Sequence, residues 1–430
     1  MDATGQPRQP EGRWLIRSAR ELAGRGDMTG RVAAAIIDAV AGIRCPEAAA
    51  DLERRGLERL HEVIDAREVG PLRDRVLDGL RPALLSLAVA VGRQFLDWKD
   101  DFFIDDYLIL RVYFPYQVAR HADPTAENLG AGRLSESVRA LFQARKTVDP
   151  VFSPFAYHRG HPPAAWAHGP HRDSWAGHSR QGWQIWWAIG EVAPEAGIVL
   201  YPELTGLNLP FDPRTLGLRA GYPLPKPTCL GLKAGELLVF NSEVPHGTHL
   251  NTSQTTRVSV SMRLSAAKPT FNPACFFARE FWRRASDIEQ GQDRILHLPR
   301  EENLGPAMEP APPPPRATAP VLAGVLNADS GIIDSGLARE AVDLKRVIVE
   351  SGPYRVLVAW TSAGLRAYEA ACPHYGLDLA DGASDGDSLY CPACAVHFDL
   401  RTGESACPSL ALRSLPVWVT EGRLHIQVNA

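Results

Sequence analysis

A proline-rich segment limits what this chain can fold into, because it separates two stretches that must build separate cores. Residues 305–320 hold seven prolines among Ala, Thr and Arg. Proline fixes φ and lacks a backbone donor, so this composition favours a stiff, extended linker. A chain of 430 residues also exceeds one ordinary core. The sequence therefore predicts an N-terminal extension at 1–99, a central domain at 100–300, a linker at 301–320 and a C-terminal domain at 321–430.

The N-terminal extension has helical character. Apolar residues recur at three- and four-residue spacing over residues 48–67, which predicts an amphipathic helix. Residues 79–98 predict a second, more buried helix, with Pro82 in its first turn, where proline is tolerated. We expect these helices to form a cap on a sheet built by later residues.

The central domain changes to short extended runs rich in β-branched, aromatic and aliphatic residues. Several short strands separated by Pro, Gly, Asn and Asp predict an antiparallel sandwich or barrel of jelly-roll type, and a chain that is mainly β outside its N-terminal helices. The runs lie at residues 107–114, 182–192, 197–201, 237–241 and 257–264. Over residues 257–264 the alternation is clean, so Arg257 and Ser259 are expected to point into the same cavity.

Three residues of this domain match a known metal-ligand set. His171 and Asp173 are two residues apart, so on an extended strand they face the same side, and His246 follows about seventy residues later. Two histidines and one carboxylate form the facial triad that binds Fe(II) and leaves the opposite face open. Arg257, eleven residues after His246, can hold a carboxylate in bidentate fashion. His249 is the alternative for the distal histidine, because it also precedes an arginine at workable spacing.

These residues carry a family resemblance over residues 100–285. The central domain resembles the phytanoyl-CoA hydroxylase-like Fe(II)/2-oxoglutarate dioxygenases in the following motifs: His171-Arg172-Asp173, residues 186–197, residues 235–241, Pro245-His246-Gly247 and Arg257. The resemblance implies a double-stranded β-helix, iron held by His171, Asp173 and His246, and 2-oxoglutarate anchored by Arg257 with Ser259 beside it. It also implies reaction with O2, and the helical cap and the Trp- and His-rich segment suggest a small organic molecule as the substrate. Since halogenating relatives have a small residue at the carboxylate position, Asp173 favours hydroxylation or a related oxidation. Residues 201–204, Tyr-Pro-Glu-Leu, depart from the family's usual turn, which puts the substrate in doubt.

A second metal signature lies beyond the linker. Cys372-Pro373-His374 is followed, after sixteen residues, by Cys391-Pro392-Ala393-Cys394, with His397 three residues further on. Thiol and imidazole ligands at such spacing bind zinc as readily as iron. Residues 320–430 resemble a Rieske ferredoxin domain, whose two loops, Cys-x-His and Cys-x-x-His, hold a 2Fe-2S cluster.

The chain departs from the Rieske pattern at one ligand, because Cys394 stands where the second histidine belongs. We expect Cys372, His374, Cys391 and Cys394 to surround a 2Fe-2S cluster. The alternatives are zinc on the same four residues, His397 as a ligand, and a metal-free domain. A thiolate in place of an imidazole should lower the reduction potential of a cluster.

Composition excludes some partners. The net charge of −4 and a pI near 6.4 give no reason to expect nucleic acid or anionic membranes as partners. The longest apolar stretch, residues 83–91, is too short to span a bilayer, and residues 1–13 lack the apolar run of a secretory signal. We therefore expect a cytoplasmic protein.

The two signatures together leave more than one function open. The first interpretation is a 2-oxoglutarate-dependent oxygenase acting on a small molecule, with a C-terminal domain for electron transfer, docking of an electron-transfer or carrier-protein partner, or structure. The alternatives are a Rieske-type, NADH-dependent ring-hydroxylating oxygenase and a non-catalytic metal-binding jelly-roll protein. A ring-hydroxylating oxygenase would have the domains in the reverse order, and its helical iron motif is not evident here.

Overall fold

The computed structural model describes residues 13–24, 26–123, 132–145, 163–165, 167–212, 216–219, 221–275, 278–307, 319–337, 345–374 and 376–428. Over these residues the chain is mainly β with a helical region near its start, which confirms the predicted class. Most of the proline-rich segment lies outside the described residues. No described helix is long and apolar enough to cross a membrane.

The helical region differs from the prediction in its boundaries. The helix expected over residues 48–67 ends at Arg55, because Gly56 adopts φ +87°, a left-handed conformation that closes the helix. The second helix begins ten residues earlier than expected, after Asp65 and Glu68 form a capping box, so Pro82 lies in its interior. The described helices are α1 (Met28–Ile43), α2 (Pro46–Arg55), α3 (Val69–Gln94), α4 (Tyr116–Ala119), α5 (Glu136–Arg145) and α6 (Ala285–Glu289).

A large sheet forms the base of the central region. Among the described residues it has nine strands: in order β1 (Trp14–Ser18), β10 (Glu236–Asn241), β5 (Gly182–Ala188), β12 (Arg257–Ser265), β2 (Phe103–Asp105), β13 (Phe281–Arg284) and β14 (Leu296–His297), with β3 (Leu108–Tyr113) on β12 and β4 (Gly132–Arg133) on β3. The strand β1 was not predicted. It belongs to the supposedly helical extension, but Trp14 pairs with Phe240 at the sheet edge.

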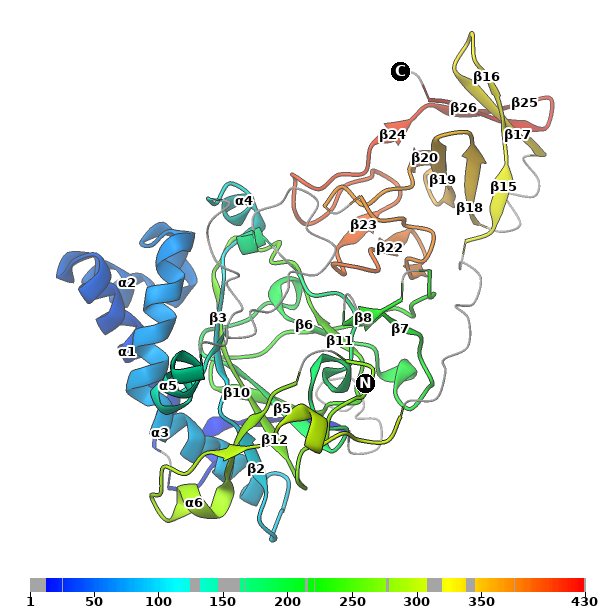
Figure 1. Cartoon of the computed structure of the whole chain (residues 1–430). Helices are drawn as coiled ribbons and strands as arrows, with labels where there is room; N and C mark the ends of the chain where they lie inside the picture. The colour runs from blue at the N-terminus through cyan, green and yellow to red at the C-terminus, as the bar shows by residue number, and fades with distance from the viewer. Residues whose placement is uncertain are drawn as a thin grey trace.

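The two faces of the large sheet have different roles. The residues Val258, Val260, Met262 and Leu264 of β12 lie in one core with Leu84 of α3, and Figure 1 shows the helices α1–α3 gathered on that side. Arg257, Ser259, Ser261 and Arg263 alternate with them and face the other way.

A small sheet and connecting loops lie on that other side. The small sheet has the order β11 (His246–Thr248), β6 (Ile198–Leu200) and β9 (Thr228–Leu230), and a short hairpin joins β7 (Phe211–Asp212) to β8 (Gly217–Leu218). Trp186 of β5, Phe240 of β10 and Leu200 of β6 share one core between the two sheets.

The C-terminal domain is all β over its described residues. A five-stranded sheet has the order β15 (Val321–Ala323), β18 (Arg346–Ser351), β19 (Tyr354–Thr361), β20 (Gly364–Glu369) and β24 (Ser414–Leu415). A four-stranded sheet has the order β16 (Val325–Asn327), β17 (Ile332–Leu337), β26 (Arg423–Gln427) and β25 (Val417–Thr420). A three-stranded sheet joins β21 (Ser384–Asp385), β22 (Ser388–Tyr390) and β23 (His397–Asp399) and is the part nearest the central region in Figure 1.

Candidate metal centres

The structure brings His171, Asp173 and His246 together. One ligand atom of each lies within 4.8 Å of the others, and all three side chains are buried. Their backbones set this geometry: His171 and His246 form an isolated antiparallel bridge with both N–H···O distances at 2.9 Å, and the Asp173 N–H donates to Ser242 O at 3.0 Å. The three ligands are thus held by main-chain hydrogen bonds as well as by side-chain packing.

Carbonyl oxygens orient both imidazoles. Nδ1 of His171 lies 2.9 Å from Gly169 O, and Nδ1 of His246 lies 2.9 Å from Val244 O. When each Nδ1 donates to its carbonyl, each Nε2 is the basic nitrogen, and these two atoms lie 3.9 Å and 4.0 Å from Oδ1 of Asp173. This arrangement of two Nε2 atoms and one carboxylate oxygen suits a divalent cation.

The local backbone is only partly the extended strand that the His-x-Asp spacing predicted. Arg172 is extended, with φ −106° and ψ 141°, but a 3-10 turn begins at Asp173. One extended residue is enough to put His171 and Asp173 on the same side. The Arg172 side chain points elsewhere and donates to Leu204 O at 3.1 Å and Leu207 O at 2.8 Å.

His168 is a neighbour that the sequence did not single out. Its ring stacks on that of His171 with centroids 3.5 Å apart, and its carbonyl accepts the Thr248 N–H at 2.9 Å. A Cβ on Gly247 would lie 2.7 Å from the same carbonyl oxygen, so glycine is needed for this close approach. Only the folded contact identifies His168, because it has no fixed spacing to the ligands.

Burial and nearby charges set the protonation of the three ligands. Burial lowers the pKa of His171 to about 3, with a further contribution from His246, and burial also lowers the pKa of His246. Burial alone would raise the pKa of Asp173, but Arg263 and the neighbouring histidines hold it well below its usual range. Neutral imidazoles and an ionised carboxylate are the forms that ligate metal.

Arg257, on the polar face of β12, presents unused donors. Its side chain is buried, Nη1 donates to Ala196 O and, at 3.1 Å, to Gly197 O, and the guanidinium lies 4.1 Å from the Tyr113 ring centroid. Among the described residues, Nε and Nη2 have no hydrogen-bond partner. Burial lowers the pKa of Arg257 to about 10, so the group stays cationic at neutral pH. Such donors suit an anion.

Other polar residues of the same face complete the surroundings. Ser259 is fully buried, and its Oγ has no hydrogen-bond partner within the described parts of the chain. Arg111 donates from Nε to Ser261 Oγ at 3.0 Å. His249, the alternative distal ligand, is not in the group with His171 and Asp173: its Nδ1 lies 2.6 Å from Leu250 O.

The second group consists of Cys372, Cys391 and Cys394. Their sulfur atoms all lie within 4.8 Å of one another, and all three residues are buried. Burial raises the pKa of the Cys391 and Cys394 thiols well above the ordinary value, so a bound cation would be needed to keep them as thiolates. His374 is outside this 4.8 Å set and contacts the central region, with Nε2 3.1 Å from Ala165 O.

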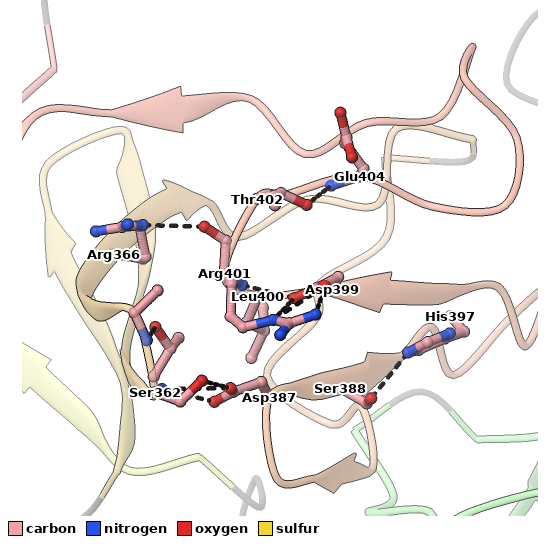
Figure 2. A network of polar contacts seen from close by, with 12 residues as sticks. Ser362, Arg366, Asp387, Ser388, His397, Asp399, Leu400, Arg401, Thr402 and Glu404 are labelled. Atoms are coloured by element: carbon pink, nitrogen blue, oxygen red, sulfur yellow. Dashed lines mark hydrogen bonds and ion pairs between the residues drawn. The ribbon is translucent and has the colours of Figure 1, made fainter.

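His397 is not part of the second group. It is exposed, and its Nε2 lies 2.8 Å from Ser388 Oγ on β22. Figure 2 shows it at the edge of a surface network that also ties Arg401 to Asp399 and Ser362 to Asp387. The alternative in which His397 acts as a ligand is therefore wrong for this structure.

Comparison with known proteins gives its clearest result for the C-terminal domain. The family model described as a Rieske [2Fe-2S] domain matches residues 338–416, which confirms that resemblance and supports a 2Fe-2S cluster as the group that domains of this kind hold. No curated protein matches the chain. The match does not extend to the central region.

Solved structures resemble separate parts of the chain at low scores. The complex of reduced oxygenase and oxidized ferredoxin in carbazole 1,9a-dioxygenase has 24% identity and a TM-score of 0.21, covering 23% of this chain and 94% of that one. The epimerase SnoN, in complex with Fe3+, alpha ketoglutarate and nogalamycin RO, has 13% identity and a TM-score of 0.30, covering 61% and 82%. Apo dicamba monooxygenase has 21% identity and a TM-score of 0.21, covering 24% and 34%.

Proposed function

We propose that the chain is a non-haem iron oxygenase that uses 2-oxoglutarate and O2 to oxidise a small organic molecule. In this proposal the large and small sheets form a double-stranded β-helix, and His171, Asp173 and His246 hold Fe(II). The support is the buried group of two Nε2 atoms and one carboxylate oxygen, which is the donor set of a facial triad.

The choice of 2-oxoglutarate as the cosubstrate depends on the side chain of Arg257. A dicarboxylate that chelates the metal through one end needs a cationic partner for the other. The buried guanidinium of Arg257 offers Nε and Nη2, for which the described residues contain no hydrogen-bond partner. A structural arginine would use these donors inside the protein, because an unmet buried donor is costly. Ser259 Oγ, two residues along the same face, is a second donor for the same carboxylate.

The protein residues position the reactants and exclude water. When bound, Fe(II) supplies the oxidative decarboxylation of 2-oxoglutarate to succinate and CO2, coupled to oxidation of the substrate. His171 and His246 keep their Nε2 atoms directed at the metal because carbonyl oxygens hold their Nδ1 atoms. Asp173 fills the carboxylate position, which favours hydroxylation or a related oxidation.

Binding of 2-oxoglutarate to the anaerobic Fe(II) protein tests this proposal. The visible absorption of the Fe(II)–2-oxoglutarate complex gives the Kd. Losing hydrogen bonds to a charged group costs about 1.5–3 kcal/mol, so Arg257→Leu should raise this Kd by about 10- to 150-fold. Arg257→Lys, which keeps the charge, should show a smaller rise, and Arg284→Leu on the exposed end of β13 should show none. An unchanged Kd in Arg257→Leu contradicts the proposal.

The Rieske match favours one other candidate, an oxygenase driven by NADH through an electron-transfer partner. Substrate oxidation with NADH and a reductase in the absence of 2-oxoglutarate would support this candidate. Consumption of 2-oxoglutarate in step with substrate oxidation would exclude it.

A further inference from the structure

The three C-terminal thiols have the spacing of ligands around one ion. Cys372 Sγ and Cys394 Sγ are 3.9 Å apart, and Cys391 Sγ lies within 4.8 Å of both. A tetrahedral zinc ion with Zn–S bonds of about 2.3 Å places its sulfur ligands about 3.8 Å from each other. The observed separation agrees with that value.

The same spacing does not suit a Rieske cluster. In a Rieske centre the two cysteines ligate one iron and the two histidines ligate the other. Cys394 occupies a histidine position, so a cluster would place it on a different iron from Cys372 and Cys391. Two irons and their bridging sulfides would then separate Cys394 from the other two sulfurs. In this structure all three sulfur atoms instead lie within 4.8 Å of one another.

The local backbone of the second loop has the form of a chelating turn. Cys391-Pro392-Ala393-Cys394 has the two-residue spacing with which paired cysteines bind a single zinc ion. The Ala393 N–H donates to Cys391 Sγ at 3.4 Å, and the Ala395 N–H donates to Cys391 O at 3.0 Å. Ala395 adopts φ +55°, which is unusual for a residue with a Cβ and holds the turn closed.

The group is also enclosed by the central region. His374 is 1% exposed, its Nε2 faces Ala165 O, and its ring meets that of Tyr116 edge-on at 5.0 Å. His374 therefore contacts the central region, and it lies outside the set of three sulfur atoms. The Leu250 N–H donates to Cys394 O at 3.3 Å, so both loops contact the central region at or next to the metal ligands.

We propose that the C-terminal domain holds a single zinc ion, ligated by the thiolates of Cys372, Cys391 and Cys394, in place of a 2Fe-2S cluster. Zinc has no redox chemistry, so such a site carries no electrons. Its role here is to fix the two loops against Ala165 and Leu250 of the central region. This assignment goes beyond the proposed function and does not depend on it.

The test is the metal and sulfide content of the full chain, purified without oxygen after expression with both iron and zinc supplied. We expect one zinc per chain and no acid-labile sulfide, because sulfide comes only from a cluster and the central iron contributes none. Cobalt exchanged into the same site should give the strong visible bands of a tetrahedral thiolate complex. Stoichiometric sulfide with a reducible EPR signal, or a C-terminal site that binds no metal, overturns the proposal.

Two variants sharpen this test. Cys394→Ser should lose the zinc, whereas Cys45→Ser, at an exposed cysteine outside the group, should keep it. Cys394→His restores the Rieske ligand set and should exchange zinc for two irons and sulfide. Zinc retained by Cys394→Ser at full stoichiometry contradicts the assignment. If Cys394→His does not fold, the cobalt spectrum of the unaltered chain decides the question.

Discussion

The two metal-ligand groups of this chain differ in what surrounds them. Around His171, Asp173 and His246 the structure places charged side chains, including Arg263 near Asp173 and Arg111 near both histidines. Around the three cysteines it places mainly backbone groups and apolar side chains, with Tyr116 nearby. The first surroundings suit a site that receives further ligands, and the second suit an ion with a structural role. We therefore expect the chemistry in the central region and a structural role for the C-terminal group.

Removing a ligand from the central group should give the largest effect on activity. In Asp173→Ala two neutral imidazoles remain, and Fe(II) loses its only charged ligand. Residues that act as a unit typically cost about 10^4-fold or more when one is removed, so we expect a loss of this size in 2-oxoglutarate turnover together with loss of bound iron. Cys394→Ser should keep the central iron. Comparable loss of iron in both variants would show that the two groups are not separate.

Removing a metal ion should reduce the stability of the fold more at the C-terminal group than at the central group, the reverse of the order expected for activity. The central ligands are held by main-chain bonds, between His171 and His246 and from Asp173 to Ser242, so loss of iron should leave the fold nearly as stable. The two cysteine loops meet at their sulfur atoms, and loss of a structural metal is among the changes that cost more than about 4 kcal/mol. Calorimetry after selective chelation should therefore show a large fall in Tm only when the C-terminal ion is removed. A larger fall on removing iron contradicts the comparison.

The pH dependence of stability should belong to the central region. Burial raises the pKa of Asp105 to about 6, and its Oδ2 lies 3.9 Å from Nη1 of Arg263. The folded state therefore binds a proton that the unfolded chain has lost, and this stabilising contribution disappears as pH rises from about 4 through 6. Asp105→Asn mimics the protonated form, so its stability relative to the unaltered chain should increase by about 2 kcal/mol between pH 4.5 and 7. Urea titrations at pH 4.5 and 7 measure this change, and parallel stabilities at the two pH values would contradict it.

The sequence predicted the parts of this architecture that depend on local pattern. Alternation over residues 257–264 placed Arg257 and Ser259 on one face, and the spacing of Cys391 and Cys394 indicated a metal loop. Contacts between distant segments could not be predicted in this way. The stacking of His168 on His171 and the pairing of β1 with β10 arise only when the chain is folded. The apolar periodicity predicted a helix that continues past residue 55, but the helix ends there because Gly56 has a positive φ. Hydrophobic periodicity carries no information about such a backbone angle.

The smallest effect should come from the charged contact between the two regions. Lys226 forms an ion pair with Asp385, but both side chains are more than half exposed, and such pairs contribute little to stability. Lys226→Ala should therefore leave the free energy of unfolding unchanged within error. Leu250→Ala, at a buried side chain whose N–H meets Cys394 O, should cost about 2–5 kcal/mol. These results would show that the metal loops, rather than surface charges, hold the two regions together. A larger loss of unfolding free energy in Lys226→Ala than in Leu250→Ala would contradict the structural role proposed for the C-terminal group.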